Sequence, residues 1–261
     1  MRGRAVASCV AAVMAAWPAS VAAQELVAAA ADTVAVTRHL LAFDLTRLRP
    51  FVREYDMYVM RGDTLHHIGV RTVTLAEMQT PDSPAGWLLT ESRTGVVAGG
   101  DTVMLAADLR PVSWTGTVGR ARLVLTFLND SVHGSATFER SSAKVSEEAP
   151  PDLVASAAML DLLVGVAPLD SAWADSVHVL VADLEGASVV PAEFAVIGQE
   201  PLGPDPLFGV AWLVSLRADL RSVQLKVDAA SGAVLRLQQS VPAHVGTFME
   251  YRLRIPFFFP P

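Results

Sequence analysis

The chain has 261 residues, of which 52% are hydrophobic and 18% are charged, and its formal net charge is −7. This length is enough for one sizeable core or at most two small domains. A chain this acidic gains nothing from a phosphate backbone, so its composition argues against nucleic-acid binding.

The first 23 residues have the layout of a secretory signal peptide. Basic "MRGR" precedes the alanine-rich run "AVASCVAAVMAAW", and Val21 and Ala23 stand at the −3 and −1 positions of the expected cut. Cleavage would remove two arginines and no acid, leaving 18 basic against 27 acidic residues, a net charge of −9. An uncleaved membrane anchor is the alternative, but Pro18 interrupts the run before the ~20 residues that a span needs. We therefore expect a periplasmic or extracellular protein with no transmembrane span after cleavage.

The single cysteine, Cys9, lies inside this segment. Its surroundings only faintly resemble a lipoprotein signal, because such a signal needs its apolar stretch before the cysteine. The mature chain is then expected to have no disulfide and no thiol chemistry, although the compartment would permit disulfides. Its stability must come from the burial of apolar surface.

Residues 24–49 are predicted to form an N-terminal tether with a short helix over 37–48. From Phe51 onward, short runs rich in Val, Thr, Leu and aromatic residues alternate with Gly, Asn-Asp and Pro, which is typical of β-strands. The runs recur roughly every ten residues, a spacing that predicts an antiparallel meander. Residues 50–241 are expected to form one curved β domain, and residues 242–261 an aromatic C-terminal tail that contains "PFFFPP".

The stretch "YVMRGDTLHHIGVRTVTL" is predicted to form a β-hairpin. Its "RGD" tripeptide fits the turn because Gly62 can take a positive φ, and an adhesion motif is the alternative. His66 and His67 would point to opposite faces of a strand, so they would not share a metal ion. We therefore predict no metal site.

One helix, over residues 152–164, is predicted to interrupt the strands. Two prolines precede it, and Asp152 is a good N-cap. After this cap only Ser156 and Asp161 are polar, so the helix is apolar all round and must be buried. It is too short to span a bilayer, and the concave face of the sheet is its natural burial site.

Large aromatic side chains fall in the predicted strands, where their simplest role is to pack in the core. They are Trp87, Trp114, Phe127, Phe138, Phe194, Phe208 and Trp212. Some of them could instead line an apolar groove between sheet and helix that holds an acyl chain or another hydrophobic ligand. The residues predicted to line this groove are Trp87, Trp114, Phe127, Met159, Leu163 and Trp212.

The sequence lacks the common catalytic and cofactor motifs: G-x-S-x-G, the P-loop, G-x-G-x-x-G, H-E-x-x-H and paired C-x-x-C. The adjacent acids Glu147 and Glu148 fit a solvated loop, because an acid/base pair would need a cleft and a partner. We therefore predict a non-enzymatic protein without a cofactor. A hydrolase with an unrecognised arrangement of Asp, His and Ser is the minor alternative, because such triads are defined by geometry.

Four segments resemble a bacterial cell-envelope family known as the domain of unknown function DUF3108. They are "YDMYVMRGDTLHHIGVRTVTL", "DTVMLAADLRPVSWTG", "FAVIGQEPL" and "LKVDAASGAVLRLQ". The last two hairpins also resemble the periplasmic lipoprotein-carrier fold (LolA/LolB-like), in which a strongly curved antiparallel sheet wraps around helices. The resemblance covers roughly residues 50–240, implies a half-barrel and supplies no catalytic residues. This chain departs from the carriers in having one clear internal helix.

The predicted fold is mainly β: a single curved antiparallel sheet, a half-barrel of about ten strands, with one apolar helix on its concave face. Two functions fit this fold. The first is an envelope protein that binds a hydrophobic ligand or a lipidated partner, such as a lipoprotein, in the groove between sheet and helix. The second is a structural or scaffolding module that contacts other envelope proteins through a sheet edge or the aromatic tail.

Overall fold

The computed structural model describes residues 43–254, except for 81–82, 119–120, 129, 139–140, 183–186, 219–220 and 241–246. The predicted signal segment, most of the tether and the "PFFFPP" segment lie outside the described residues. Within the helix predicted over 37–48, Leu45–Arg47 form a single 3-10 turn, η1, and residues 37–42 lie outside the description.

Strands form one continuous 15-stranded sheet in the order β8-β7-β6-β5-β4-β3-β2-β1-β15-β14-β13-β12-β11-β10-β9. Their bounds are β1 Phe51–Arg61, β2 Thr64–Thr80, β3 Ser83–Gly95, β4 Gly99–Ala106, β5 Pro111–Val118, β6 Ala121–Leu128, β7 Ser131–Phe138, β8 Ser141–Glu148, β9 Leu153–Val154, β10 Ala174–Ala182, β11 Ala187–Pro201, β12 Val210–Ala218, β13 Arg221–Asp228, β14 Val234–Ser240 and β15 Thr247–Leu253. The β9–β10 pair is parallel and the other pairs are antiparallel. The prediction of a mainly β fold with one curved sheet is confirmed, with 15 strands in place of about ten.

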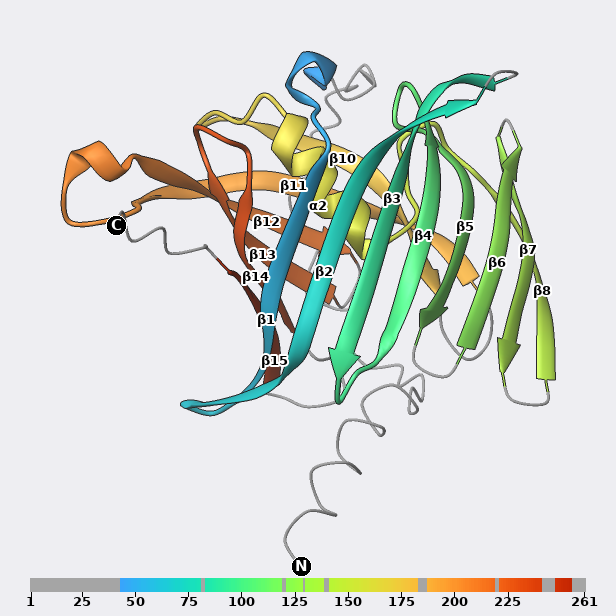
Figure 1. Ribbon diagram of the computed structural model, residues 1–261, viewed down its shortest axis with the longest axis horizontal. Coiled ribbons are helices and arrows are strands. Elements are labelled where there is room, and N and C mark those ends of the chain that lie inside the picture. The colour runs from blue at the N-terminus through green and yellow to red at the C-terminus, as the bar shows by residue number, and fades with distance from the viewer. Residues whose placement is uncertain are drawn as a thin grey trace, which may run out of the picture.

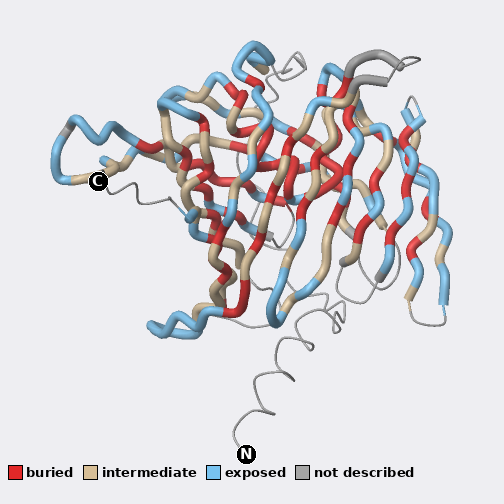
Figure 2. The backbone as a smooth tube through the Cα atoms, viewed as in Figure 1, coloured by how far each residue is buried: buried red, intermediate tan, exposed pale blue. Residues whose placement is uncertain are grey.

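The sheet curls around the helix α2 (Ala157–Val166), which contacts β3 in one half of the sheet and β14 in the other (Figure 1). The two ends of the sheet approach each other, since β8 also contacts β11. Buried and more exposed positions alternate along many strands, as a sheet with one covered face requires (Figure 2). The core therefore lies inside the curl, on the concave side.

The predicted C-terminal tail over 242–261 is wrong for Thr247–Leu253, which form β15 in the middle of the sheet. β15 pairs with β1 on one side and with β14 on the other. Without β15, both neighbours would expose rows of unpaired backbone N–H and C=O groups. Its sequence "TFMEYRL" is rich enough in aromatic and apolar residues to fill that central place.

The predicted helix over 152–164 is buried as expected, but it begins later. Leu153 and Val154 form β9 and pair in parallel with β10, so their backbone groups are satisfied outside a helix. The Asp152 carboxylate lies 2.9 Å from His178 Nδ1 instead of capping the helix, and Ser156 holds the N-cap position. Among the helices of the described residues, none is long and apolar enough to cross a membrane.

The predicted hairpin between β1 and β2 is confirmed. The two strands are antiparallel up to the Arg61–Thr64 pair, and Gly62 has a φ of +57°. His66 lies opposite Val59, whereas His67 lies opposite Tyr58 and places its Nε2 3.2 Å from Asp56 Oδ1. The described residues contain no group of three or more His, Cys, Asp or Glu side chains that could hold a metal ion.

A bulge in this hairpin brings Gly69 against the next strand. Gly69 has a φ of +155°, and a Cβ there would lie 1.9 Å from the Thr94 carbonyl oxygen. We therefore expect Gly69→Ala to lower the free energy of unfolding by roughly 2–4 kcal/mol, because the clashing atom is backbone.

Gly62→Ala is the matched control, since Gly62 has a φ of +57° and no atom within 4 Å of the added Cβ. It should cost about 1 kcal/mol through backbone conformation alone. Urea denaturation measures both variants. Equal losses would show that the close approach at Gly69 is unimportant.

Candidate functional site

The apolar helix α2 carries one charged side chain, and that side chain faces the sheet. Asp161 is 0% exposed, and its Oδ2 lies 2.7 Å from Nη1 of Arg71 on β2. An unpaired ionised carboxylate in an apolar interior costs several kcal/mol. Arg71 supplies the cation that compensates this cost for the ionised Asp161.

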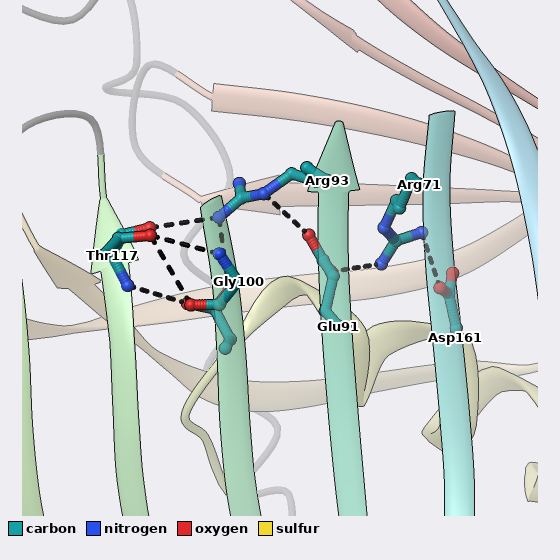
Figure 3. Close-up of polar contacts among 7 residues, drawn as sticks. Arg71, Glu91, Arg93, Gly100, Thr117 and Asp161 are labelled. Carbon is teal, nitrogen blue, oxygen red and sulfur yellow. Dashed lines mark hydrogen bonds and ion pairs between the residues drawn. The ribbon is translucent and has the colours of Figure 1, made fainter. Parts of the chain in front are cut away.

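Arg71 is itself enclosed by groups that favour its charge. Its Nη2 donates to Glu91 Oε2 at 2.8 Å (Figure 3), and its guanidinium carbon lies 5.3 Å from the Tyr55 ring and 5.4 Å from the Tyr251 ring. The strand register sets this arrangement, because Tyr55 pairs directly with Arg71 across β1 and β2. The guanidinium thus has carboxylates and aromatic faces as neighbours, both of which attract a cation.

Arg93 and Asp101 extend the ion pairs toward β4. Arg93 Nε lies 3.3 Å from Glu91 Oε1, and its Nη2 lies 3.6 Å from Asp101 Oδ2. Glu91 and Asp101 are directly opposed in the register of β3 and β4, so their charges repel. Arg93 reduces that repulsion, and the Thr117 backbone N–H donates to Asp101 Oδ1 at 3.2 Å.

We call these residues, together with Arg53 of β1, whose charge lowers the pKa of Asp161, the core charge cluster: Arg53, Arg71, Arg93, Glu91, Asp101 and Asp161. Three arginines face three acids, so the cluster is neutral when every member is ionised. Burial raises the pKa of Asp101 to about 6, and the Glu91 charge adds to that shift. Burial also raises the pKa of Asp161, although Arg71 opposes the shift. Burial by itself would lower the pKa of Arg71, but Asp161 and Glu91 outweigh it and raise that pKa.

Several buried polar atoms of this region receive no well-directed hydrogen bond within the described structure. They are Arg53 Nη1, Tyr55 Oη, Arg71 Nη1, Arg93 Nε, Trp114 Nε1, Asp161 Oδ1 and Asp161 Oδ2. Arg71 and Asp161 nevertheless form a close ion pair at 2.7 Å. The cluster consists of carboxylates and guanidinium groups, and the Arg71–Asp161 contact joins it to the helix. This contact links α2 to the strand β2.

The six predicted groove residues all belong to one hydrophobic core or pack against it. Trp114, Phe127, Met159 and Leu163 are buried, whereas Trp87 and Trp212 are partly buried against that core. The structure brings Trp212 to a small recess beside α2. A groove lined by all six residues stays a prediction.

The recess lies where α2 ends. It has a volume of about 30 Å³ and is lined by Arg47, Val164, Ala167, Leu169, Trp212, Val227, Asp228, Ala229 and Gly232. A volume of this size holds about one water molecule. A hydrophobic ligand of ordinary size needs several hundred Å³. The recess in this conformation therefore accepts no acyl chain.

The core charge cluster was missed in the sequence, although a signal was present. Asp161 is the single acid in a helix that had to be buried, and a buried carboxylate requires a cation. Arg71 is two residues from Val73 and so shares a strand face with it, and Val73 is fully buried. Joining these two observations would have predicted the ion pair.

Comparisons with known proteins give little beyond the fold. No family model matches the chain, and no curated protein sequence matches it. A similar solved structure is the crystal structure of a beta-barrel-like protein of domain of unknown function DUF1849 from Brucella abortus. It has a TM-score of 0.49 and 11% sequence identity, and the match covers 80% of this chain and 97% of that chain. The resemblance to DUF3108 stays an expectation from the sequence.

Removing the central cation tests the cluster. We expect Arg71→Met to lower the free energy of unfolding by roughly 3–5 kcal/mol, because it leaves buried carboxylates without their partner. Arg110→Met is the control, since Arg110 pairs with Asp108 at 2.7 Å but is 61% exposed. That variant should lose at most about 1 kcal/mol. Similar losses in urea denaturation would mean that the buried pair does not hold the helix.

The raised pKa of Asp101 predicts a pH dependence of stability. A carboxyl group whose pKa rises on folding, here from 3.8 to about 6, binds its proton more tightly in the folded state. Its stabilising contribution is complete below the unfolded pKa and is lost as the pH rises through the folded pKa. Between pH 4 and pH 7 the loss from this group is roughly 2–3 kcal/mol.

Asp101→Asn removes the titrating carboxyl group and, with it, the pH-dependent contribution of this residue to stability. The stability difference between wild type and Asp101→Asn should therefore change by roughly that amount between pH 4 and pH 7, with the wild type favoured at the lower pH. Asp108→Asn is the control, because it removes a carboxylate from an exposed ion pair and so shows the effect of losing one negative charge at the surface. A pH-independent difference for Asp101→Asn would contradict the raised pKa.

Proposed function

We propose that the protein is an exported, non-enzymatic scaffolding module of the cell envelope that binds other envelope proteins through its surface. The observation that carries this proposal is the filled concave side of the sheet. Eight of the ten residues of α2 are buried there: Ala158, Met159, Leu160, Asp161, Leu162, Leu163, Val164 and Val166. Export rests on the signal-like N-terminal sequence.

The edges of the sheet offer the surface that such a module needs. β8 is the first strand in the sheet order and is hydrogen-bonded to β7 alone among the described strands, although it also contacts β11. The opposite edge strand, β9, has two residues. Most β8 side chains are exposed, including Lys144, Glu147 and Glu148. Charges on an edge strand disfavour pairing between identical copies, while the backbone still accepts a suitable partner strand.

A second candidate is the binding of a hydrophobic ligand or a lipidated partner. The recess favours it, because Trp212 and Val164 bring an aromatic and an apolar wall together at the end of α2. An acyl chain would enter this region only if α2 moved, since the recess measures about 30 Å³. This candidate therefore requires a second conformation of the helix.

Purification of residues 24–261 from the native host separates the two candidates. Scaffolding predicts a reproducible, stoichiometric protein partner and no lipid in the mass spectrum of the purified protein. About one lipid per chain would replace the scaffolding proposal with the second candidate. Deleting residues 255–261 then tests the tail: if the partner still co-purifies, the tail is not the contact and the β8 edge is left.

A further inference from the structure

The outer face of β13, β14 and β15 carries three basic side chains in one cross-strand row, which we call the basic row: Lys226, Arg236 and Arg252. The register places Lys226 opposite Arg236 and Arg236 opposite Arg252, on three strands that lie side by side (Figure 1). Their chain neighbours Leu225 and Leu237 are buried in the core, and successive side chains of a strand point to opposite faces. The three cations therefore share the outer face, with about 5 Å between adjacent strands.

Like charges that lie directly opposite each other in a sheet destabilise it, so the basic row has to be compensated. Glu200 Oε2 lies 2.8 Å from Lys226 Nζ, and Glu250 Oε1 pairs with Arg252 Nε. The pKa of Glu200 is lowered by its hydrogen bond and charge interaction with Lys226 and, to a smaller extent, by Arg236. The two end members of the row are thus compensated within the chain.

Arg236, the central member of the row, forms no ion pair with a carboxylate of the described part of the chain. The other acids near the row are engaged elsewhere. Asp56, which opposes Arg252, accepts two hydrogen bonds from Arg254 at 2.9 and 2.6 Å. Asp228 of β13 accepts hydrogen bonds within the turn that follows it. Arg236 is partly exposed, so one cation of the row is open to an anion from outside the chain.

The groups around Arg236 fit a carboxylate side chain of a protein better than a phosphate. One positive charge is left uncompensated, and a carboxylate carries one negative charge, whereas a phosphate monoester carries nearly two at pH 7. A guanidinium group also binds a carboxylate through two parallel N–H bonds. The flanking pair on the same face, Gln224 and Gln238, is neutral and supplies amide hydrogen bonds rather than further cations. The Arg252 guanidinium carbon lies 5.2 Å from the centre of the Tyr58 ring, and arginine and tyrosine are enriched in protein interfaces.

We propose that the basic row is a docking surface for a protein partner, whose Asp or Glu carboxylate is bound by Arg236 between Lys226 and Arg252. This contact rests on the proposed scaffolding function and specifies the surface and the chemistry of the partner. The row lies on β13–β15, far along the sheet order from β8, so it is separate from strand pairing at the β8 edge. A side-chain contact selects the partner by charge, whereas strand pairing uses backbone groups that every chain has.

Titration of residues 24–261 labelled with 15N, followed through the arginine Nε–H signals, tests the chemistry of the row. The probes are the α-amide of N-acetylglutamate, which carries one carboxylate, and inorganic phosphate. We expect the Arg236 signal, assigned with Arg236→Lys, to shift saturably with the glutamate probe. The same shift should need about five-fold more phosphate, because only the carboxylate matches the remaining charge and the planar guanidinium. Arg122, an exposed arginine on the outer face of β6, is the control and should not saturate with either probe.

Co-purification of residues 24–261 from the native host tests the surface. The amount of the stoichiometric partner should fall at least about ten-fold for Arg236→Gln and less for Arg236→Lys, which keeps the charge but not the planar fork. Two controls should stay within about two-fold of the wild type, because both lie outside the row. Arg122→Gln removes an arginine from the other half of the sheet. Phe208→Ser removes an apolar side chain from the 3-10 turn η2 (Pro206–Phe208), where Phe208 is 62% exposed although the sequence predicted that it would pack in a strand.

Circular dichroism confirms that each variant is folded, and the titration itself is made on the wild type. An unchanged amount of partner with Arg236→Gln would overturn the basic row as the contact and leave the scaffolding function standing. The absence of any partner on the wild type would overturn both. Stronger binding of phosphate than of the glutamate probe, or no saturable shift at Arg236, would overturn the carboxylate as the ligand. An equal loss of partner with Phe208→Ser would show that the charge of the row does not specify the contact.

Discussion

A guanidinium buried inside a curved sheet is the constraint on which this architecture depends. Arg71 comes from β2, yet its charge is balanced by acids of two other elements, Glu91 on β3 and Asp161 on α2. Burial of apolar surface favours the placement of α2 on the concave side of the sheet. Because this effect has no direction, it does not select one position of the helix along that side. Sliding or rotating α2 would separate Asp161 from its cation and leave both charges buried. The ion pair therefore sets the register of the helix, and the apolar side chains supply the affinity.

Local patterns in the sequence were enough to predict the hairpins and the burial of α2. Both depend on side-chain periodicity and turn chemistry over a few residues, as at the turn that contains Gly62. The two-residue strand β9 has no measurable period, and β15 is recognised only through its distant partners. The pairing of Arg71 with Asp161 likewise joins residues far apart in the sequence. The features that could not be predicted from the sequence are therefore those that depend on contacts between residues far apart in the chain.

The central place of β15 has a consequence for how the sheet assembles. Most strand pairs join neighbours in the chain, but β1 and β15 pair from opposite ends of the described sequence. Tyr251 of β15 also lies against Arg71, so the last strand completes the environment of the central cation. Because long-range pairing carries a high loop-closure entropy, we expect this step to come late in folding. The charge cluster is then complete only when the two halves of the sheet are joined.

The distribution of polar and apolar groups also bears on where function lies. Four charged side chains of the cluster, Arg71, Glu91, Asp101 and Asp161, are buried on the concave side, whereas one of the most exposed apolar residues, Leu207, lies in the connection between β11 and β12. A buried charge cluster can be explained by the helix it positions. An ordered and almost fully exposed leucine contributes nothing to the core, and its exposure to water is unfavourable. Because α2 and the charge cluster fill the concave side, a partner that leaves the helix in place has to contact the outer face or the edges of the sheet.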